Sequence, residues 1–508
     1  MSVSLGLGFA IAGSEIGNIN DQFALLGHNI ANAGTPDYSV ETASQQALTG
    51  SGVGLGAREG VVGRSVNTQL QSGLLAQNGT VAALQTTATA LQQIDAVEGA
   101  PGSGSDLASR LGMLQNQFVA LETDPASATQ QSAVVSAAQG LATQINAVST
   151  AVQGVRQNAQ NGVVSGVQTL NSTLASIGVL NKQIVTAQAA GQSTADLMNQ
   201  RDAAVDTLSN LVSVSVIHQP DGSVLLATAG GLVLPTDGTA LATQPATLGA
   251  ASYAPGGGVP AITLAGRDVT AQLQGGSLGA DIMLRDQTLP TLRANLDEFA
   301  HTLSTRFAAQ GLTLFSDSAG SVPAGGGSPV QSGYLGYAAE IQVNPAVLAT
   351  PSLVRDGTSA IAGAAGGASA FTPNPAGGPA GFNTLITRVL DYALGADAQT
   401  GVAQPAPATG GLGAAGTLSA GFAPPPDLAA QATAVVAQEA ATSAAASGQL
   451  TEEQGVQATL QSQLSGTSAV SIDSEMSTMI QLQNAYDANA KVLSTVQAMW
   501  SQLLQAVQ

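Results

Sequence analysis

The sequence predicts a mainly α protein with β insertions. In this prediction both termini build a long coiled-coil-like helical bundle, and a smaller β-rich domain lies outside it. Two observations support this fold class. Apolar residues alternate at spacings of three and four at both ends and in several internal segments, which is the heptad pattern of packed helices. Between about 211 and 280 apolar and polar residues alternate instead, which is typical of strands.

The N-terminal segment shows the heptad pattern clearly. Its apolar track supplies five candidate assembly residues, which are Ile16, Ile19, Phe23, Leu26 and Ile30. Gly34 and Pro36 predict the end of this helix, because Gly favours a left-handed cap and Pro cannot continue a helix.

The C-terminal segment mirrors the first. One heptad track there supplies five more candidates, which are Met476, Met479, Tyr486, Leu493 and Trp500. Ser471 or Asp473 can cap the start of the helix. Residues 492–508 carry no charged side chain, and a terminal helix that water solvates poorly normally packs against other chains. We therefore expect the two terminal helices to pack between molecules.

The change of period along the chain predicts four parts. Residues 1–45 and 470–508 are expected to be the terminal coiled-coil helices of an inner tube. Residues 46–210, 281–315 and 427–469 are expected to form a helical bundle shaped like a rod. Residues 211–280 are expected to form the β-rich outer domain, with a turn at Gln219-Pro220-Asp221-Gly222. Residues 316–426 are a Gly/Pro/Ala-rich insert whose fold the sequence leaves open.

The composition excludes several classes of protein. The 508 residues include 13 Lys+Arg against 32 Asp+Glu, for a net charge of −19, and no Cys. A nucleic-acid binder or a protein of anionic membrane surfaces needs more basic charge. Disulfides, thiolate zinc sites and iron–sulfur clusters need Cys. The sequence contains no run of 18 apolar residues, so it predicts no membrane span. A cleaved secretory signal needs basic residues near its start, and the absence of Lys and Arg before Arg58 argues against one.

No motif in the sequence requires an enzyme, a metal or a cofactor. The Gly52–Ala57 stretch matches a dinucleotide pattern only formally, and a flexible turn is the favoured interpretation. His28, His218 and His301 lie far apart and are expected at or near the surface. Arg-Asp pairs recur at 201–202, 285–286 and 355–356. Adjacent helical residues do not face each other, so we expect the two members of each pair to bind different partners in structural ion pairs.

Residues 26–39, with the sequence LGHNIANAGTPDYS, resemble the N-terminal signature N-I-A-N-x-x-T-P-G-Y-S of flagellar rod, hook and hook-associated proteins. The resemblance adds Asn29, Asn32, Pro36 and Tyr38 to the candidate assembly residues. Residues 471–493 are similar to the closing helix of the same superfamily. Asp37 stands where the family usually has Gly, and His28 stands where a small polar residue is usual; the sequence leaves the effect of Asp37 open.

Internal stretches narrow the resemblance to FlgK-type hook-associated proteins. These stretches are Asn199-Gln200-Arg201-Asp202 with the turn at 221–222, Gly275–Gly279 with Arg285-Asp286, and Thr123–Ala126. The resemblance covers about residues 1–315 and 430–508. It implies a non-enzymatic structural protein that leaves the cell through the flagellar type III channel and forms a ring-like layer at the junction of hook and filament.

The partners implied by the resemblance are further copies of the chain, the hook protein, and a second junction protein similar to FlgL. A FlgN-like export chaperone is expected to hold the C-terminal helix. No cofactor, nucleic acid or membrane partner is implied. Two alternatives stay open: another flagellar axial protein, such as hook, distal rod or flagellin, and a secreted enzyme or adhesin with an Ala/Gly-rich stalk. The number of copies in the ring does not follow from the sequence.

Overall fold

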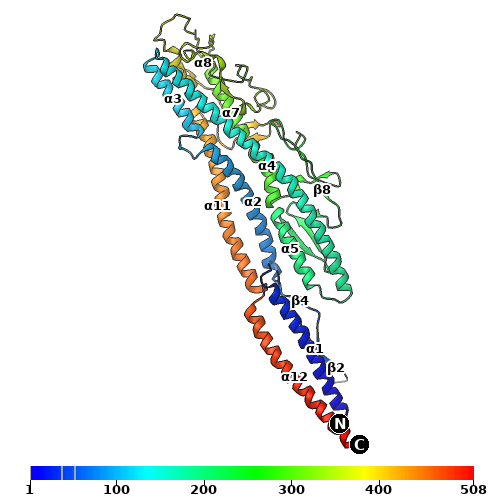
Figure 1. The fold of residues 1–508 in the computed structure, drawn as a ribbon. Helices are drawn as coiled ribbons and strands as arrows, with labels where there is room; N and C mark the ends of the chain where they lie inside the picture. Colours follow the sequence, from blue (N-terminus) through cyan, green and yellow to red (C-terminus); the bar gives the residue numbers. More distant parts are fainter. Residues whose placement is uncertain (1, 36–37, 51–52, 508) are drawn as a thin grey trace.

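The computed structural model of this chain is an elongated, mainly helical molecule with both termini at the same end (Figure 1). The structure describes residues 2–35, 38–50 and 53–507. The α-helices are α1 (Ser2–Asn32), α2 (Thr68–Glu98), α3 (Leu107–Thr123), α4 (Ala128–Ala189), α5 (Ala195–Leu211), α6 (Gly276–Met283), α7 (Leu289–Ala309), α8 (Pro345–Ala349), α9 (Leu353–Asp356), α10 (Thr384–Arg388), α11 (Leu428–Ser468) and α12 (Ile472–Val507).

The strands are short, and all their pairings in the described part of the chain are antiparallel. They are β1 (Glu41–Thr42), β2 (Gln45–Gly50), β3 (Val53–Glu59), β4 (Gly63–Arg64), β5 (Val214–His218), β6 (Val224–Thr228), β7 (Val233–Leu234), β8 (Leu241–Ala242), β9 (Thr263–Leu264), β10 (Arg267–Asp268), β11 (Phe315–Ser316), β12 (Gln342–Val343), β13 (Asp397–Gln399), β14 (Val402–Ala403), β15 (Gly410–Leu412) and β16 (Leu418–Ser419).

The long helices lie nearly parallel to one axis. Helices α1 and α12 pair at the end that carries the termini, and α2 and α11 pair above them (Figure 1). Side-chain caps set the starts of several helices: Asn67 caps α2, Asp106 caps α3, Ser127 caps α4 and Asp427 caps α11. Each cap oxygen accepts a backbone N–H that has no partner within the helix.

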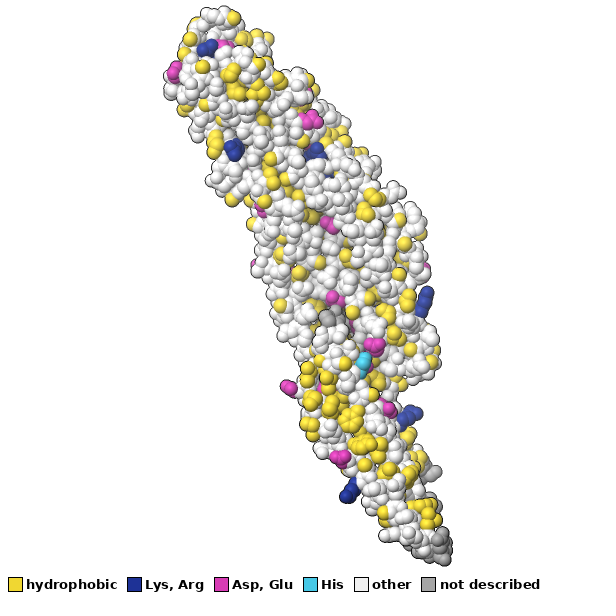
Figure 2. All heavy atoms as spheres, in the orientation of Figure 1, with side chains coloured by type: hydrophobic (Ala, Val, Ile, Leu, Met, Phe, Trp, Pro, Cys, Tyr) yellow, Lys and Arg dark blue, Asp and Glu magenta, His cyan; other side chains and the backbone are white. Residues whose placement is uncertain are grey.

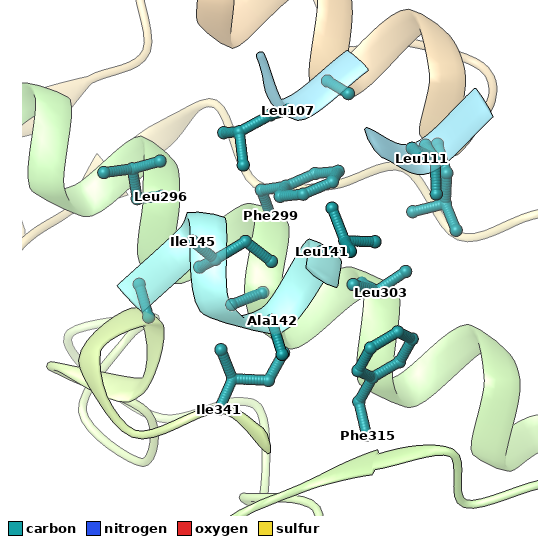
Figure 3. Close-up of a cluster of buried hydrophobic side chains, with 14 of the residues drawn as sticks. Leu107, Leu111, Leu141, Ala142, Ile145, Leu296, Phe299, Leu303, Phe315 and Ile341 are labelled. Atoms are coloured by element: carbon teal, nitrogen blue, oxygen red, sulfur yellow. The ribbon is translucent and has the colours of Figure 1, made fainter. Parts of the chain in front are cut away.

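The main core lies at the end of the molecule far from the termini. Side chains from α3, α4 and α7 meet there, among them Leu107, Ile145 and Phe299, none of which is exposed (Figure 3). Phe315 and Ile341 pack into the same cluster (Figure 3). Because Ile341 belongs to the 316–426 region, that region is folded against the bundle.

A second core underlies the β-rich region. Strands β5, β6 and β7 form one sheet, whose buried side chains Val224 and Leu226 pack with residues of α4 and α5. The expected turn at 219–222 connects β5 to β6, and Gly222 adopts a φ of 83° that suits glycine. The alternating pattern therefore predicted these strands correctly.

Two glycines of α4 allow α6 to pack closely on it. Helix α6 crosses α4 at Gly162 and Gly166, where an added Cβ would lie 2.2 Å from the Asp281 carboxylate and 3.2 Å from Leu278. The close approach of the two helices requires that both positions lack a side chain. The buried track of α4 continues through this crossing, since Val163 and Val167 are both buried.

The first β elements correct the sequence interpretation. Residue 45 was expected in a terminal helix and residues 46–64 within the helical bundle, yet β2 and β3 form a hairpin that lies along α1. Alternation in Val53–Glu59 matches a strand, and Asn18 of α1 donates a hydrogen bond of 2.7 Å to the carbonyl of Ala57. Residues 53–57 of the expected flexible turn are therefore strand, and 51–52 lie outside the described residues. The left-handed cap expected at Gly34 is also absent; Thr35 instead donates a backbone hydrogen bond of 2.9 Å to the carbonyl of Asn32.

The Arg-Asp pairs are a further correction. Arg285 donates to Asp286 at 2.7 and 2.8 Å, and Arg355 donates to Asp356 at 2.7 and 2.9 Å, so these neighbours do bind each other. The arginine side chain is long enough to fold back over its own helix, and Arg285 lies in a π-helical turn at Leu284–Thr288. At the third pair the expectation holds in part, because Arg201 donates to the carbonyl of Gly222 at 2.8 Å.

Within the described part of the chain, α4 alone is long and apolar enough to cross a membrane by length and composition. Its apolar track, which includes Val134, Leu141 and Leu170, is buried against neighbouring helices and strands. Such burial is typical of the core helix of a folded bundle.

Candidate functional site

The paired terminal helices and their attachment to the body form the candidate site. Helix α1 contacts α12 on one side and the β2–β3 hairpin on another. Ala12, Ile19 and Leu26 follow each other at intervals of seven residues and are 2%, 1% and 6% exposed. The N-terminal apolar track therefore packs within this one molecule.

The N-terminal candidates share this environment. Ile19 and Leu26 are buried, and Ile16, Phe23 and Ile30 are half-buried. Phe9 precedes them on the same track and is 45% exposed, so burial decreases toward the chain end.

The C-terminal candidates divide between two environments. Met479 and Leu493 are half-buried in the paired helices, whereas Met476, Tyr486 and Trp500 are 45%, 38% and 45% exposed. The structure therefore does not bring the five residues to one packed face of α12. A single heptad track cannot show which of its members a partner helix covers.

The apolar surface of α12 extends beyond these candidates. Its large exposed apolar side chains are Ile472, Met476, Ile480, Tyr486, Val492, Met499, Trp500, Leu503 and Leu504. Ile472, Met476 and Ile480 share one helix face, because residues four apart lie one above the other. Figure 2 shows apolar side chains gathered on this end of the molecule, with several charged side chains around them. Exposed apolar side chains in this number mark an interaction site.

The attachment of α1 to the body centres on Asn29. Its side-chain oxygen accepts hydrogen bonds from the Tyr38 hydroxyl at 3.0 Å and from the backbone N–H of Glu41 at 3.1 Å. Its amide donates to the carbonyl of Glu41 at 2.9 Å. Asn29 is 2% exposed, so these bonds fix the return of the chain along the end of α1. Asn32 lies on the exposed side and donates to the carbonyl of His28 at 3.0 Å, while Pro36 lies outside the described residues.

The same segment binds to helix α5. Asn199 is 5% exposed; its side chain accepts from the backbone N–H of Ser39 at 3.2 Å and donates to the Glu41 carboxylate at 3.3 Å. Arg64 donates to Asn199 and to Asp202, both at 2.9 Å. The motif at 26–39 and the motif at 199–202, which are far apart in the sequence, therefore meet at one place.

A third connection comes from the end of α11. The carbonyl of Ser468 accepts from the backbone N–H of Val40 at 2.8 Å, and its hydroxyl accepts from the N–H of Asn67 at 3.3 Å. Ser471 then begins α12, with its hydroxyl 3.4 Å from the backbone nitrogen of Ser474, which confirms it as the cap. The 38–41 segment thus touches α1, α5 and α11 at once.

Burial changes the acidity of this junction. It raises the pKa of Glu41, against the opposing effect of His28, whose Nδ1 lies 3.5 Å from the carboxylate. Burial and the neighbouring Glu41 also raise the pKa of Tyr38, so its hydroxyl stays protonated and can donate to Asn29. The junction is a hydrogen-bonded joint and offers no arrangement of nucleophile and base.

Metal-binding groups and histidines elsewhere in the described residues add no further site. The described residues contain no group of three or more His, Asp or Glu side chains that could hold a metal ion. His218 is exposed on β5, and His301 stacks on Tyr334 with ring centroids 3.9 Å apart.

Sequence reasoning did not predict the roles of Arg64, Glu41 and Ser468 in the junction. The Asn199–Asp202 motif was noticed, but only as part of a resemblance. Its four residues are mostly polar in an otherwise apolar helical pattern, and that signal points to a buried polar contact.

Comparisons with known proteins find similarity to flagellar axial proteins. A family model described as "Flagellar hook-associated protein FlgK helical domain" matches residues 91–321, and one described as "Flagellar basal body rod FlgEFG protein C-terminal" matches residues 461–506. Flagellar hook-associated protein 1 of Bacillus subtilis is 28% identical over 218 residues, covering 41% of this chain and 43% of that protein. Its counterpart in Salmonella typhimurium is 30% identical over 212 residues, covering 39% and 37%.

A solved structure of the flagellar hook junction protein FlgK from Burkholderia pseudomallei is 26% identical, with a TM-score of 0.40, and covers 50% of this chain and 45% of that one. The chain thus spans less than half the length of the relatives it matches. Those relatives are structural proteins and not enzymes. The helical-domain match and these relatives agree, and both show that the chain is similar to the FlgK-type flagellar hook-associated proteins.

Proposed function

We propose that this chain is a structural subunit of the flagellar hook–filament junction, where many copies form a ring-like layer. One observation carries the proposal: α1 and α12 pair at the end of the molecule and leave a long apolar surface of α12 uncovered. Water solvates this surface poorly, and neighbouring helices of further copies would cover it.

The same geometry supports the proposed partners. A subunit layer between hook and filament needs contacts below and above it, so the hook protein and a FlgL-like junction protein are the proposed neighbours. Type III export requires a chain that travels unfolded, and a FlgN-like chaperone that covers the apolar face of α12 would protect it before assembly.

A strain without this chain tests the role. We expect intact hooks, no filaments and free flagellin in the medium, with motility restored by the full chain. Substitution of Leu493 or Trp500 by Asp in the restoring chain should lower assembly strongly, because a charge would lie on the surface to be buried. Normal filament formation by both variants would contradict the assignment of this surface.

Another axial position is the second candidate, because the model that matches residues 461–506 is described for rod proteins. The larger match at 91–321 favours the hook-associated group. Fluorescent labelling of the chain on isolated flagella separates the two. A single band between hook and filament supports the junction, whereas label along the whole hook or within the basal body supports the alternative.

A further inference from the structure

A groove lies between α2 and α4, away from the junction of the terminal helices. Its volume is about 310 Å³, and it is lined by Gln85, Thr86, Thr89 and Gln93 of α2, by Val155, Asn158 and Ala159 of α4, and by Asp281 and Leu284. Amide and hydroxyl side chains line it beside one carboxylate, and most of its exposed surface is apolar.

Asp281 has no hydrogen-bond or ion-pair partner within the described part of the chain. It lies against α4 at Gly162, where any Cβ would collide with the carboxylate. Burial raises its pKa to about 7, and Arg285 opposes that shift only in part. Arg285 itself is already bound to Asp286, Gln160 and the carbonyl of Pro260. A partly buried carboxylate without a partner costs stability, and a cation delivered to the groove would offset that cost.

Basic side chains are scarce in this protein, so few of them could supply such a cation. Most arginines of the body are buried or ion-paired, as Arg156, Arg201 and Arg388 illustrate. Among the described residues 65–471, the exposed basic side chains are Lys182 and Arg267. Neither makes a hydrogen bond through its side chain or an ion pair within 4.0 Å, although Lys182 lies close enough to Asp237 to help lower that carboxyl's pKa.

We propose that the groove at Asp281 binds a basic side chain, Lys182 or Arg267, from the body of a second copy of this chain. The proposal rests on the proposed function, in which copies stand side by side in a layer. Such neighbours would bring body against body, since the long axes of the copies would be aligned. The surrounding Gln, Thr and Asn side chains can orient the incoming ammonium or guanidinium group. The contact would then act in addition to the apolar packing of the terminal helices.

The test uses the full chain in a deletion strain and measures the amount of chain per hook on isolated flagella. We expect Asp281→Asn to lower that amount about tenfold, since loss of one partner of a desolvated pair is costly. Glu452→Gln is the matched control, because Glu452 is an exposed carboxylate of the body and its loss changes the net charge equally. Thermal unfolding of the purified Asp281→Asn chain should show a midpoint at or above that of the parent.

Two further variants identify the donor. Lys182→Gln or Arg267→Gln should reproduce the loss, and if Lys182 is the donor, a carbodiimide should join it to Asp281 of another copy in a cross-linked peptide. Provided that the parent chain is found on flagella, two results would overturn the inference. One is an amount of the Asp281→Asn chain per hook equal to that of Glu452→Gln, and the other is an unreduced amount of both donor variants. Absence of the parent chain from flagella would instead contradict the proposed function.

Discussion

The body and the terminal pair are both helical, yet they bury their side chains very differently. In the body Phe118, Phe299 and Phe307 are completely buried, whereas none of the α12 side chains described from 472 to 505 is buried. Side-chain burial dominates the free energy of folding, so the body holds its own structure. The terminal pair has a similar apolar pattern but lacks the layers that would enclose it. Similar heptads therefore enclose a core in one region and leave apolar side chains uncovered in the other, where we propose that copies associate.

The largest expected effect comes from deleting the C-terminal helix, which tests whether the body folds without it. Removal of residues 470–508 should abolish assembly on flagella and still leave a body that unfolds cooperatively. The reason is that the deleted helix contacts α1 but lies outside both main cores. Circular dichroism during heating and sedimentation of the truncated chain check this. Loss of cooperative unfolding in that chain would show that the terminal pair belongs to the folding core.

Substitutions of two phenylalanines, one in each region, test the difference in side-chain burial within the full chain. Phe299→Ala should lower the free energy of unfolding by about 3–5 kcal/mol, because it leaves a cavity in a close-packed core. Phe9→Ala, at a side chain that is 45% exposed, should change it by less than about 0.5 kcal/mol. Urea unfolding of the two variants gives both values, and similar losses would erase the proposed division.

The joint between the two regions should respond in an intermediate way. Asn199→Ala leaves Ser39 and Glu41 without their partner and should cost about 1–3 kcal/mol. Hydrogen exchange should accelerate in residues 38–64 and stay unchanged around Phe299. Gln200→Ala is the control, since that neighbouring side chain is exposed and bonds only to Asp196. Equal exchange in the two variants would contradict the role of Asn199.

The smallest effect concerns acidity within the body. Burial, with Asp95 and Glu98 nearby, raises the pKa of Glu439 on α11 from 4.5 to about 9, and burial raises that of Glu98 on α2 to about 7. The folded protein then binds more protons than the unfolded chain between those values, so stability should fall as the pH rises from about 5 to 9. Glu439→Gln should flatten this slope and stabilise the protein at pH 8 by about 1 kcal/mol. An unchanged slope in thermal unfolding across that range would argue against a protonated Glu439.

Much of the fold followed from local patterns. The heptads predicted α1, α12 and helices in several internal segments, and alternation predicted β5 and β6, because the side chains that repeat are mostly those that the fold buries. The hairpin at 45–59 was missed. In Val53–Glu59 the apolar residues alternate with Gly rather than with polar side chains, and Leu48 and Leu55 are exposed, so the pattern lacks the apolar–polar alternation of a half-buried strand.

The sequence indicated several residues of the candidate site, but it did not indicate how they are arranged in space. Ile19 and Leu26 are buried as their spacing suggests, but the exposure of Met476 and Tyr486 depends on the side from which α1 approaches α12. Likewise, the contact between Asn199 and Ser39 spans 160 residues of chain, and no local pattern encodes a contact over that separation. The only sign of this long-range contact in the sequence is the presence of polar residues within a helical segment.

The connection between α11 and α12 has a mechanical consequence. Helix α11 ends at Ser468, which is bonded to Val40 and Asn67, and α12 begins at Ile472, so only three residues join the two helices. Torsion within those three residues can change the tilt of the terminal pair while Ser468 holds the body's side of the joint. In a curved or rotating tube, subunits on opposite sides need different tilts. A joint placed outside both cores would let each copy bend without repacking its interior.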